Sequence, residues 1–339
     1  MTTTHETDVV IIGAGPVGLF AIFECGMLRM RCHVVDTLEA VGGQCSALYP
    51  EKPIYDIPGY PAIEAQTLID RLSEQAAPFD PVFHLDQQVM TLERLEDGRL
   101  RLETSKGTVL LAKAVILAAG VGAFGPNRPP LEGIEAYERH SIFYMVQRRE
   151  AFRNRRVVIA GGGDSAVDWA ISLADVAAKV MVVHRRAKFR AAPESAARLA
   201  DLAESGTIEL VTPYQLAGLE GEGGRLQAVL VEDMDGEKKR LDADVLLPFF
   251  GLSMNLGPIL DWGLALDRNI VTVESSTAAT NIPGVFAIGD IATYPGKLKL
   301  ILAGFAEAAQ AAHAIHPLVH PGEALHFEYS TSKGRPSAA

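Results

Sequence analysis

The sequence predicts an α/β fold made of two similar three-layer domains, because one local pattern occurs twice. In each copy a short apolar strand runs into a glycine-rich turn, an apolar helix follows, and a second apolar strand closes the unit. The strands are expected at Asp8–Ile12 and Cys32–Val35 in the first copy, and at Arg156–Ala160 and Lys179–Val183 in the second. The helices between them are expected at Leu19–Met30 and Val167–Ala177.

Length and composition agree with this organisation. The chain has 339 residues, more than a single hydrophobic core usually supports, and 48% of them are hydrophobic. The formal net charge of -11 argues against non-specific binding of nucleic acid. The polar, acidic start does not resemble a secretory signal, and no apolar run approaches the roughly 20 residues of a membrane helix. We therefore expect a cytoplasmic protein that binds neither nucleic acid nor a membrane.

The first glycine-rich turn has the spacing of a Rossmann-like dinucleotide cradle. Gly13 permits the tight turn, Gly15 lets a pyrophosphate approach the backbone, and Gly18 lets helix and strand pack closely, with Pro16 inside the same turn. Asp36 ends the second strand, 18 residues after Gly18, where a carboxylate accepts hydrogen bonds from the hydroxyls of a ribose. The alternative is an ordinary tight turn, which does not explain an acid at that distance.

The second turn repeats this pattern. Gly161, Gly163, Asp164, Ser165 and Ala166 occupy it, and a helix is expected directly afterwards. We therefore predict a second dinucleotide site in the same chain.

Basic residues replace the ribose acid in the second copy. His184, Arg185 and Arg186 follow the second strand, and Arg190 lies about one turn later. Guanidinium groups suit a 2′-phosphate, and no acid stands there to repel it, so NADP(H) is expected rather than NAD(H). The alternative is a solvated basic strand end.

Alternating polar and apolar residues predict a small antiparallel meander in each domain, at Glu93–Leu111 and Ala217–Asp244. Each meander precedes an apolar strand and a glycine segment, where the chain is expected to cross between domains. The predicted domains are 122–251 and a discontinuous one made of 1–121 and 252–339.

The C-terminal segment is expected to complete the first domain, because it has no third glycine-rich turn of this kind. Its apolar strand runs into Gly289 and Asp290. We expect this pair to lie beside the first cradle; the alternative is a plain turn.

Taken together, these motifs resemble the two-dinucleotide-domain flavoproteins. Along nearly the whole chain the sequence is most similar to the ferredoxin–NADP reductases of the thioredoxin-reductase-like type. The signatures are Gly43 and Gln44, the run around Tyr49, the segment Lys297–Glu307 and the C-terminal Phe327–Lys333.

The resemblance implies FAD in the discontinuous domain and NADP(H) in the domain 122–251. It further implies that Tyr49 stacks on one face of the flavin and Tyr329 on the other, and that Ser330 hydrogen-bonds flavin N5. Tyr329 would act as a gate that the nicotinamide displaces. The implied reaction is hydride transfer between NADP(H) and FAD, coupled to one-electron exchange with ferredoxin or flavodoxin, in a homodimer.

The cysteines argue against disulfide reduction. The chain contains only Cys25, Cys32 and Cys45, and no Cys-x-x-Cys. Thioredoxin reductases carry their redox pair shortly before the second glycine turn, where this chain has His140–Gln147. Cys45 lies near the first redox position of the glutathione-reductase group, but Pro50 takes the place of the second. We therefore interpret Cys45 as a small buried residue.

Some alternatives stay open. The stretch Arg148–Arg156 contains five arginines that suit an acidic protein partner, or that form a solvated surface. The chain is alternatively an NADPH-dependent oxidase or reductase with another acceptor, or a non-catalytic flavin-binding module. We expect no metal site, because His313, His316 and His320 are loosely spaced and fit a helix end.

Overall fold

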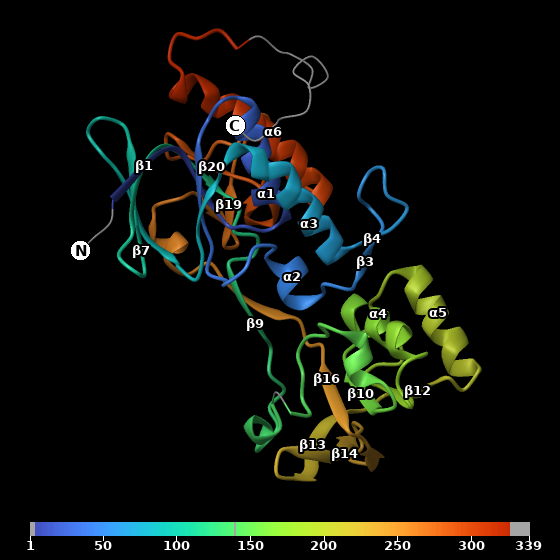
Figure 1. The fold of residues 1–339 in the computed structure, drawn as a ribbon. Coiled ribbons are helices and arrows are strands. Elements are labelled where there is room, and N and C mark those ends of the chain that lie inside the picture. Colours follow the sequence, from blue (N-terminus) through green and yellow to red (C-terminus); the bar gives the residue numbers. More distant parts are fainter. Residues whose placement is uncertain (1–3, 139, 326–339) are drawn as a thin grey trace. The chain divides into compact units, whose positions relative to one another are not determined.

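The computed structural model describes residues 4–138 and 140–325 (Figure 1). The chain divides into two compact units. One is Gly125–Ser253, and the other joins the described residues up to Phe124 with those from Met254 onward. β9 (Ala123–Pro126) and β17 (Leu252–Asn255) carry the chain across the two borders and pair with each other. Within the described residues, no helix combines the length and the apolar character that crossing a membrane demands.

A parallel sheet forms the centre of the first unit. It runs in the order β5 (Val82–His84), β2 (Cys32–Val35), β1 (Thr4–Ile12), β8 (Val109–Leu117) and β20 (Val285–Ala287). The C-terminal halves of β1 and β8 are continuous apolar runs, as expected for strands that are covered on both faces.

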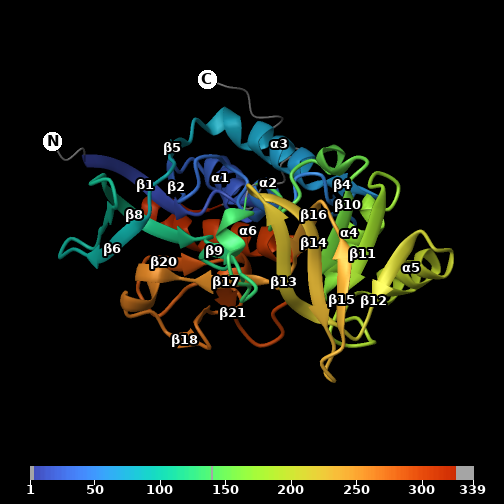
Figure 2. The same ribbon diagram turned by 90° about the horizontal axis from the view of Figure 1, so that it is seen from below.

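Helices cover one face of this sheet. α1 (Pro16–Met27) packs beside α3 (Ala65–Ala76) and α6 (Ile301–Val319), as Figure 2 also shows, and one apolar cluster joins all three helices to the sheet. On the other face, β6 (Val89–Arg94), β7 (Leu100–Thr104) and the first half of β8 form an antiparallel meander that contributes to a second cluster. The first unit therefore has three layers.

The remaining elements of the first unit are short: α2 (Gln44–Leu48), β3 (Pro53–Ile54), β4 (Ile63–Glu64), β18 (Leu266–Asp267), β19 (Ile270–Thr272) and β21 (Ala292–Thr293). β3 pairs with β4, and β19 pairs with both β18 and β21.

The second unit has a parallel sheet of four strands, in the order β12 (Ile208–Val211), β11 (Lys179–Val183), β10 (Arg156–Ala160) and β16 (Val245–Pro248).

A helical layer and a meander accompany this sheet. α4 (Asp164–Leu173) contacts β10 and β11 and packs on α5 (Pro193–Glu204). β13 (Gln215–Glu222), β14 (Arg225–Glu232) and β15 (Lys238–Asp242) form the meander, which shares an apolar cluster with β10 and β11. The architecture confirms the predicted α/β class of two Rossmann-like, three-layer units with small antiparallel meanders.

Both cradle helices begin earlier than predicted. α1 starts at Pro16 and α4 at Asp164, each directly after its glycine N-cap, Gly15 or Gly163. Proline suits the first helical position, because its fixed φ is already helical and the missing N–H would have no partner there. The helix N-termini therefore lie at the glycine turns themselves.

Candidate functional site

Backbone contacts explain the glycines of the first turn. A Cβ on Gly13 would lie 2.3 Å from the carbonyl oxygen of Ala118, and a Cβ on Gly18 would lie 2.0 Å from the carbonyl oxygen of Gly13. Gly13 also has a φ of +110°, which side chains disfavour. No atom lies within 4 Å of a Cβ on Gly15. Packing therefore requires two of the glycines, whereas the third borders open space.

This open space adjoins the N-terminus of α1. Gly15 is its N-cap, and the first turn carries no acidic residue. The unpaired N–H groups and the positive end of the helix dipole attract an anion to such a place. A side chain at Gly15 would enter this space.

Asp36 follows β2 and braces the turn. Its Oδ2 accepts the amide of Ala14 at 2.6 Å, and its Oδ1 accepts the amide of Leu38 at 2.8 Å. Burial raises the pKa of Asp36, although these backbone amides act in the opposite direction. Each carboxylate oxygen has a second lone pair, so Asp36 can hold the loop and still accept from ribose hydroxyls.

The segment after β2 folds back over the first turn. The amide of Gly42 donates to the carbonyl of Ala14 at 2.8 Å, and a Cβ on Gly43 would lie 3.1 Å from the Cα of Gly15. Gly43 has a φ of +56°, so its conformation also favours glycine. Gln44, the first residue of α2, directly follows.

Tyr49 is a partly buried residue at the end of α2. The thiol of Cys45 lies 3.9 Å from its hydroxyl oxygen. Cys45 itself is 2% exposed, and burial raises the pKa of its thiol to about 11. A thiol that stays protonated near neutral pH is a poor nucleophile, which agrees with the structural role expected for Cys45.

Gly289 and Asp290 lie at the carboxyl end of β20, next to the first cradle. A Cβ on Gly289 would lie 3.5 Å from the side chain of Val17, near the start of α1. Burial first, and then Cys45 and the charge of Asp290, raise the pKa of Tyr49 well above its usual value. The structure thus brings the predicted site residues of the first unit together at one end of its parallel strands, the usual ligand position in such sheets. Tyr329 and Ser330 lie outside the described residues.

The sequence reading missed the role of one residue in this region. Glu307 on α6 is 2% exposed, and it accepts hydrogen bonds from the Gly289 amide and the Tyr294 hydroxyl, both at 2.7 Å. The ammonium of Lys297 also contacts its carboxylate. The sequence offered two signals: Glu307 ends the signature segment Lys297–Glu307, and it is the one acid in the mostly apolar sequence of Ile301–Val319.

The second turn repeats the geometry of the first. Gly161 has a φ of +155°, and its Cβ would lie 2.7 Å from the carbonyl oxygen of Phe249. Gly163, the N-cap of α4, again has no atom within 4 Å of its Cβ position. Asp164 uses its Oδ1 to accept the amide of Ala192 at 2.8 Å, and so anchors the loop that carries the basic residues. Ser165 is exposed beside it, and the next residue, Ala166, is buried.

The predicted basic residues near this turn comprise three exposed arginines and one histidine that packs against the turn. Arg185, Arg186 and Arg190 are exposed, and the backbone amide of Arg190 donates to the carbonyl of Gly162 at 2.6 Å. His184 instead packs against the turn, because its ring lies 2.2 Å from the position that a Cβ on Gly162 would take. Burial, and then the nearby arginines, lower the pKa of His184 against an opposing backbone hydrogen bond. We therefore distinguish a packing histidine from three arginines that are available to a phosphate.

Acidic neighbours pair with three of the five arginines of the predicted docking stretch. The pairs are Arg149 with Asp175, Arg153 with Glu150 and Arg156 with Asp244, at N–O distances of 2.6, 2.7 and 2.6 Å. Pairing within the chain reduces the charge offered to a partner, so the geometry favours the alternative of a self-stabilised surface.

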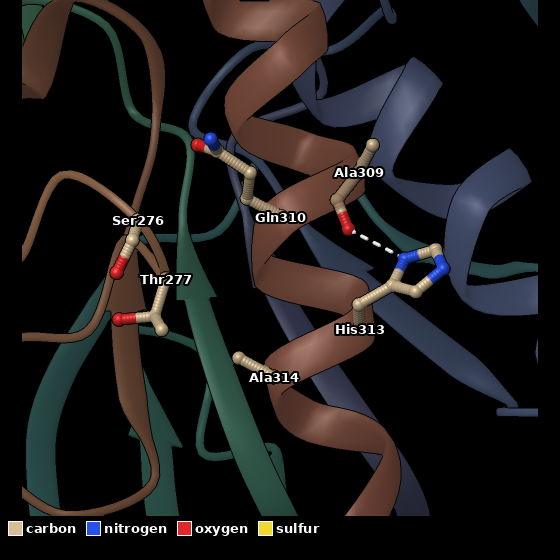
Figure 3. A pocket seen from close by; sticks show the side chains of 6 residues that line it. All are labelled: Ser276, Thr277, Ala309, Gln310, His313 and Ala314. Carbon is tan, nitrogen blue, oxygen red and sulfur yellow. Dashed lines mark hydrogen bonds between the residues drawn. The ribbon is translucent and has the colours of Figure 1, made fainter. Parts of the chain in front are cut away.

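A surface pocket elsewhere in the first unit contains none of the predicted cofactor residues. It is lined by Ser276, Thr277, Ala309, Gln310, His313 and Ala314 (Figure 3). His313 uses its Nδ1 to donate to the carbonyl of Ala309 at 2.9 Å, one helical turn earlier (Figure 3). Among the residues that the structure describes, no three His, Cys, Asp or Glu side chains are arranged to hold a metal ion.

Two cradles with open helix N-termini define a chain built to bind two dinucleotides. A family model described as pyridine nucleotide-disulphide oxidoreductase matches residues 7–314. The chain belongs to this family. The thioredoxin reductase of Lactococcus lactis has a similar solved structure, with a TM-score of 0.77 and 25% identity, covering 92% of this chain and 99% of that one.

Curated relatives are much closer in sequence. The ferredoxin–NADP reductase of Paramagnetospirillum magneticum is 68% identical over 98% of both chains. The ferredoxin–NADP reductase of Rhodospirillum rubrum is 65% identical and covers 99% of this chain and 98% of its own length. These relatives confirm the resemblance inferred from the sequence motifs.

Proposed function

We propose that the chain is a ferredoxin–NADP reductase. It transfers hydride between NADP(H) and FAD and exchanges single electrons with ferredoxin. The observation that carries this proposal is the 68% identity, over 98% of the chain, to a curated enzyme of that name. FAD occupies the discontinuous unit and NADP(H) the unit around Gly125–Ser253, close to the domains expected at 1–121 with 252–339 and at 122–251.

The residues present fit both cofactors. The open spaces at Gly15 and Gly163 are cradles that a Cβ would partly fill. The first would hold FAD with Gly13, Gly15, Pro16, Gly18, Asp36, Gly43, Gln44, Tyr49, Gly289 and Asp290, joined by Tyr329 and Ser330. The second would hold NADP(H) with Gly161, Gly163, Asp164, Ser165, Ala166, Arg185, Arg186 and Arg190, while His184 supports the turn by packing against it.

The two cradles bind the phosphates in the same way but bind the ribose in different ways. The N-termini of α1 and α4 supply unpaired N–H groups and a favourable dipole for a pyrophosphate. Asp36 accepts from ribose hydroxyls in the first unit. The guanidinium groups of Arg185 and Arg186 bind a 2′-phosphate in the second unit, which selects NADP(H) over NAD(H).

Bound FAD supplies the conversion between a two-electron donor and a one-electron acceptor. The chain positions it, with Tyr49 on one face and Tyr329 as a displaceable cover on the other. No thiol pair takes part, because the sequence has no Cys-x-x-Cys, and its three cysteines, Cys25, Cys32 and Cys45, are free and buried.

Flavodoxin serves as an alternative acidic partner, the enzyme acts as a homodimer, and it works in the cytoplasm away from membranes. A different acceptor, such as oxygen or a quinone, and a non-catalytic flavin-binding module are the competing functions.

Anaerobic titration with NADPH tests the proposal. The purified protein should be yellow, and NADPH should bleach its flavin absorbance, whereas the same concentration of NADH should bleach it far more slowly. Flavin that stays oxidised in excess NADPH would favour the non-catalytic module.

A further inference from the structure

A buried charged cluster joins α6 to the Gly289–Asp290 turn. The side chains of Glu307 and Lys297 are 3% and 4% exposed and are in contact as an ion pair. Glu307 Oε1 also accepts the hydroxyl of Tyr294 at 2.7 Å, and Oε2 accepts the amide of Gly289 at 2.7 Å. Charged residues are almost never buried to this extent unless they are paired.

Fold stability alone does not account for this cluster. A buried ion pair generally adds little over apolar residues of the same volume, because desolvation offsets the attraction. What an apolar replacement would not supply is an acceptor for the Gly289 amide. This amide belongs to a residue with a φ of +74°, directly before Asp290.

The cluster is continuous with the first cradle. The Cβ positions of Gly289 and of Gly304 on α6 both face the side chain of Val17, at 3.5 and 2.4 Å. Val17 is the second residue of α1, whose N-terminus borders the open space at Gly15. A displacement of the Gly289 turn would therefore move Asp290 relative to that space.

We propose that Glu307 is a positioning residue for the flavin. Its Oε2 accepts the Gly289 amide and so fixes the place of Asp290, while Tyr294 and Lys297 contact the other carboxylate oxygen, Oε1. Lys297 also supplies the countercharge that lets the carboxylate stay ionised when buried. The inference rests on the proposed function, in so far as FAD is the ligand of the first cradle.

Two matched double variants separate the acceptor from the charge. Both carry Lys297→Met, which removes the ammonium. One adds Glu307→Gln, which keeps an acceptor for the Gly289 amide and a partner for the Tyr294 hydroxyl. The other adds Glu307→Met, which keeps the side-chain volume but no acceptor.

Apoprotein of each variant is titrated with FAD, and binding is followed by quenching of flavin fluorescence. The visible absorbance of the bound flavin and the thermal midpoint of the apoprotein are recorded as well. The glutamine variant should bind FAD within about threefold of the original chain, and the methionine variant about tenfold or more weakly, as expected for one lost hydrogen bond in a buried site. The flavin absorbance bands should shift only in the methionine variant.

Equal FAD affinity and equal spectra in the two variants would overturn the inference and leave the proposed function intact. An original chain that binds no FAD would overturn both.

Tyr294→Phe provides a milder test that does not depend on the methionine variant folding, because Lys297 and Gly289 keep their contacts with Glu307. It should alter FAD affinity by less than about threefold, since the Gly289 contact is unchanged. A tenfold loss would mean that packing of the 294–297 loop, and not the Gly289 contact, sets the affinity.

Discussion

The Cα of Gly15 lies 3.1 Å from the position that a Cβ on Gly43 would take, so the two segments of the first cradle meet with no room between them. In contrast, no atom lies within 4 Å of the position that a Cβ on Gly15 itself would take. This asymmetry makes Gly15 a selective probe of cofactor binding.

Gly15→Ala should weaken FAD binding and leave the apoprotein stable. Its φ of -73° suits alanine, so the free energy of unfolding of the apoprotein should change by less than about 1 kcal/mol. FAD affinity should fall at least about tenfold, because the methyl group hinders hydrogen bonds to a charged pyrophosphate. Gly18→Ala is the contrasting control, because its Cβ would clash with the Gly13 carbonyl and destabilise the fold itself. Unchanged FAD affinity in Gly15→Ala would place the cofactor elsewhere.

Gly163→Ala should separate the two cofactors. The Cβ position of Gly163 is also free of neighbours, so the purified variant should keep its FAD and its yellow colour. The KM for NADPH should rise about tenfold or more, because the methyl group enters the second cradle. Steady-state kinetics and the ratio of flavin to protein measure the two effects. Loss of FAD in this variant would contradict the assignment of cofactors to units.

Arg185 and Arg186 should determine the choice of NADP(H). Replacing both with alanine should raise the KM for NADPH about tenfold or more and leave the KM for NADH nearly unchanged, because only NADPH carries the 2′-phosphate. Arg198→Ala, a change on α5, serves as a matched control for loss of positive charge. An equal rise in the KM for NADPH and in the KM for NADH would show that the two arginines do not bind the 2′-phosphate.

His33 should make the folded state less stable in mild acid. Burial, and then the neighbouring His84 and His5, lower the pKa of His33 from 6.5 to about 4, and its Nδ1 lies 2.9 Å from Nε2 of His84. In the unfolded chain His33 becomes protonated as the pH falls through 6.5, whereas in the folded chain it stays neutral until about pH 4. The free energy of unfolding therefore decreases as the pH falls from 6.5 to about 4. Allowing for solvent screening, the loss amounts to about 1 to 2 kcal/mol.

Urea unfolding at a series of pH values measures this loss, with His33→Asn as the comparison. The stability difference between the original chain and the variant should shrink as the pH falls from 6.5 to about 4. A difference that is independent of pH would show that His33 does not carry this titration.

The sequence allowed the framework of the fold to be predicted closely. Strands β2, β10 and β11 have the predicted bounds, because continuous apolar runs bounded by turns leave little freedom. The starts of α1 and α4 were missed, since apolar periodicity does not detect a helix that begins at Pro16 or Asp164 inside the turn. The two glycine turns could be predicted because their spacing is local.

Contacts between distant segments could not be predicted in the same way. Glu307 reaches Gly289 across 18 residues, and Arg156 pairs with Asp244 across 88, so no local pattern encodes either contact. A buried acid in an apolar helix indicates only that some partner exists. Which partner it has depends on how the loop before α6 folds.

Electron transfer to ferredoxin can be measured as the reduction of cytochrome c by NADPH, with and without added ferredoxin. We expect rapid reduction that depends on ferredoxin and that falls when NADH replaces NADPH. Equal rates with and without ferredoxin would mean that the flavin passes its electrons to another acceptor and that the chain is not a ferredoxin–NADP reductase.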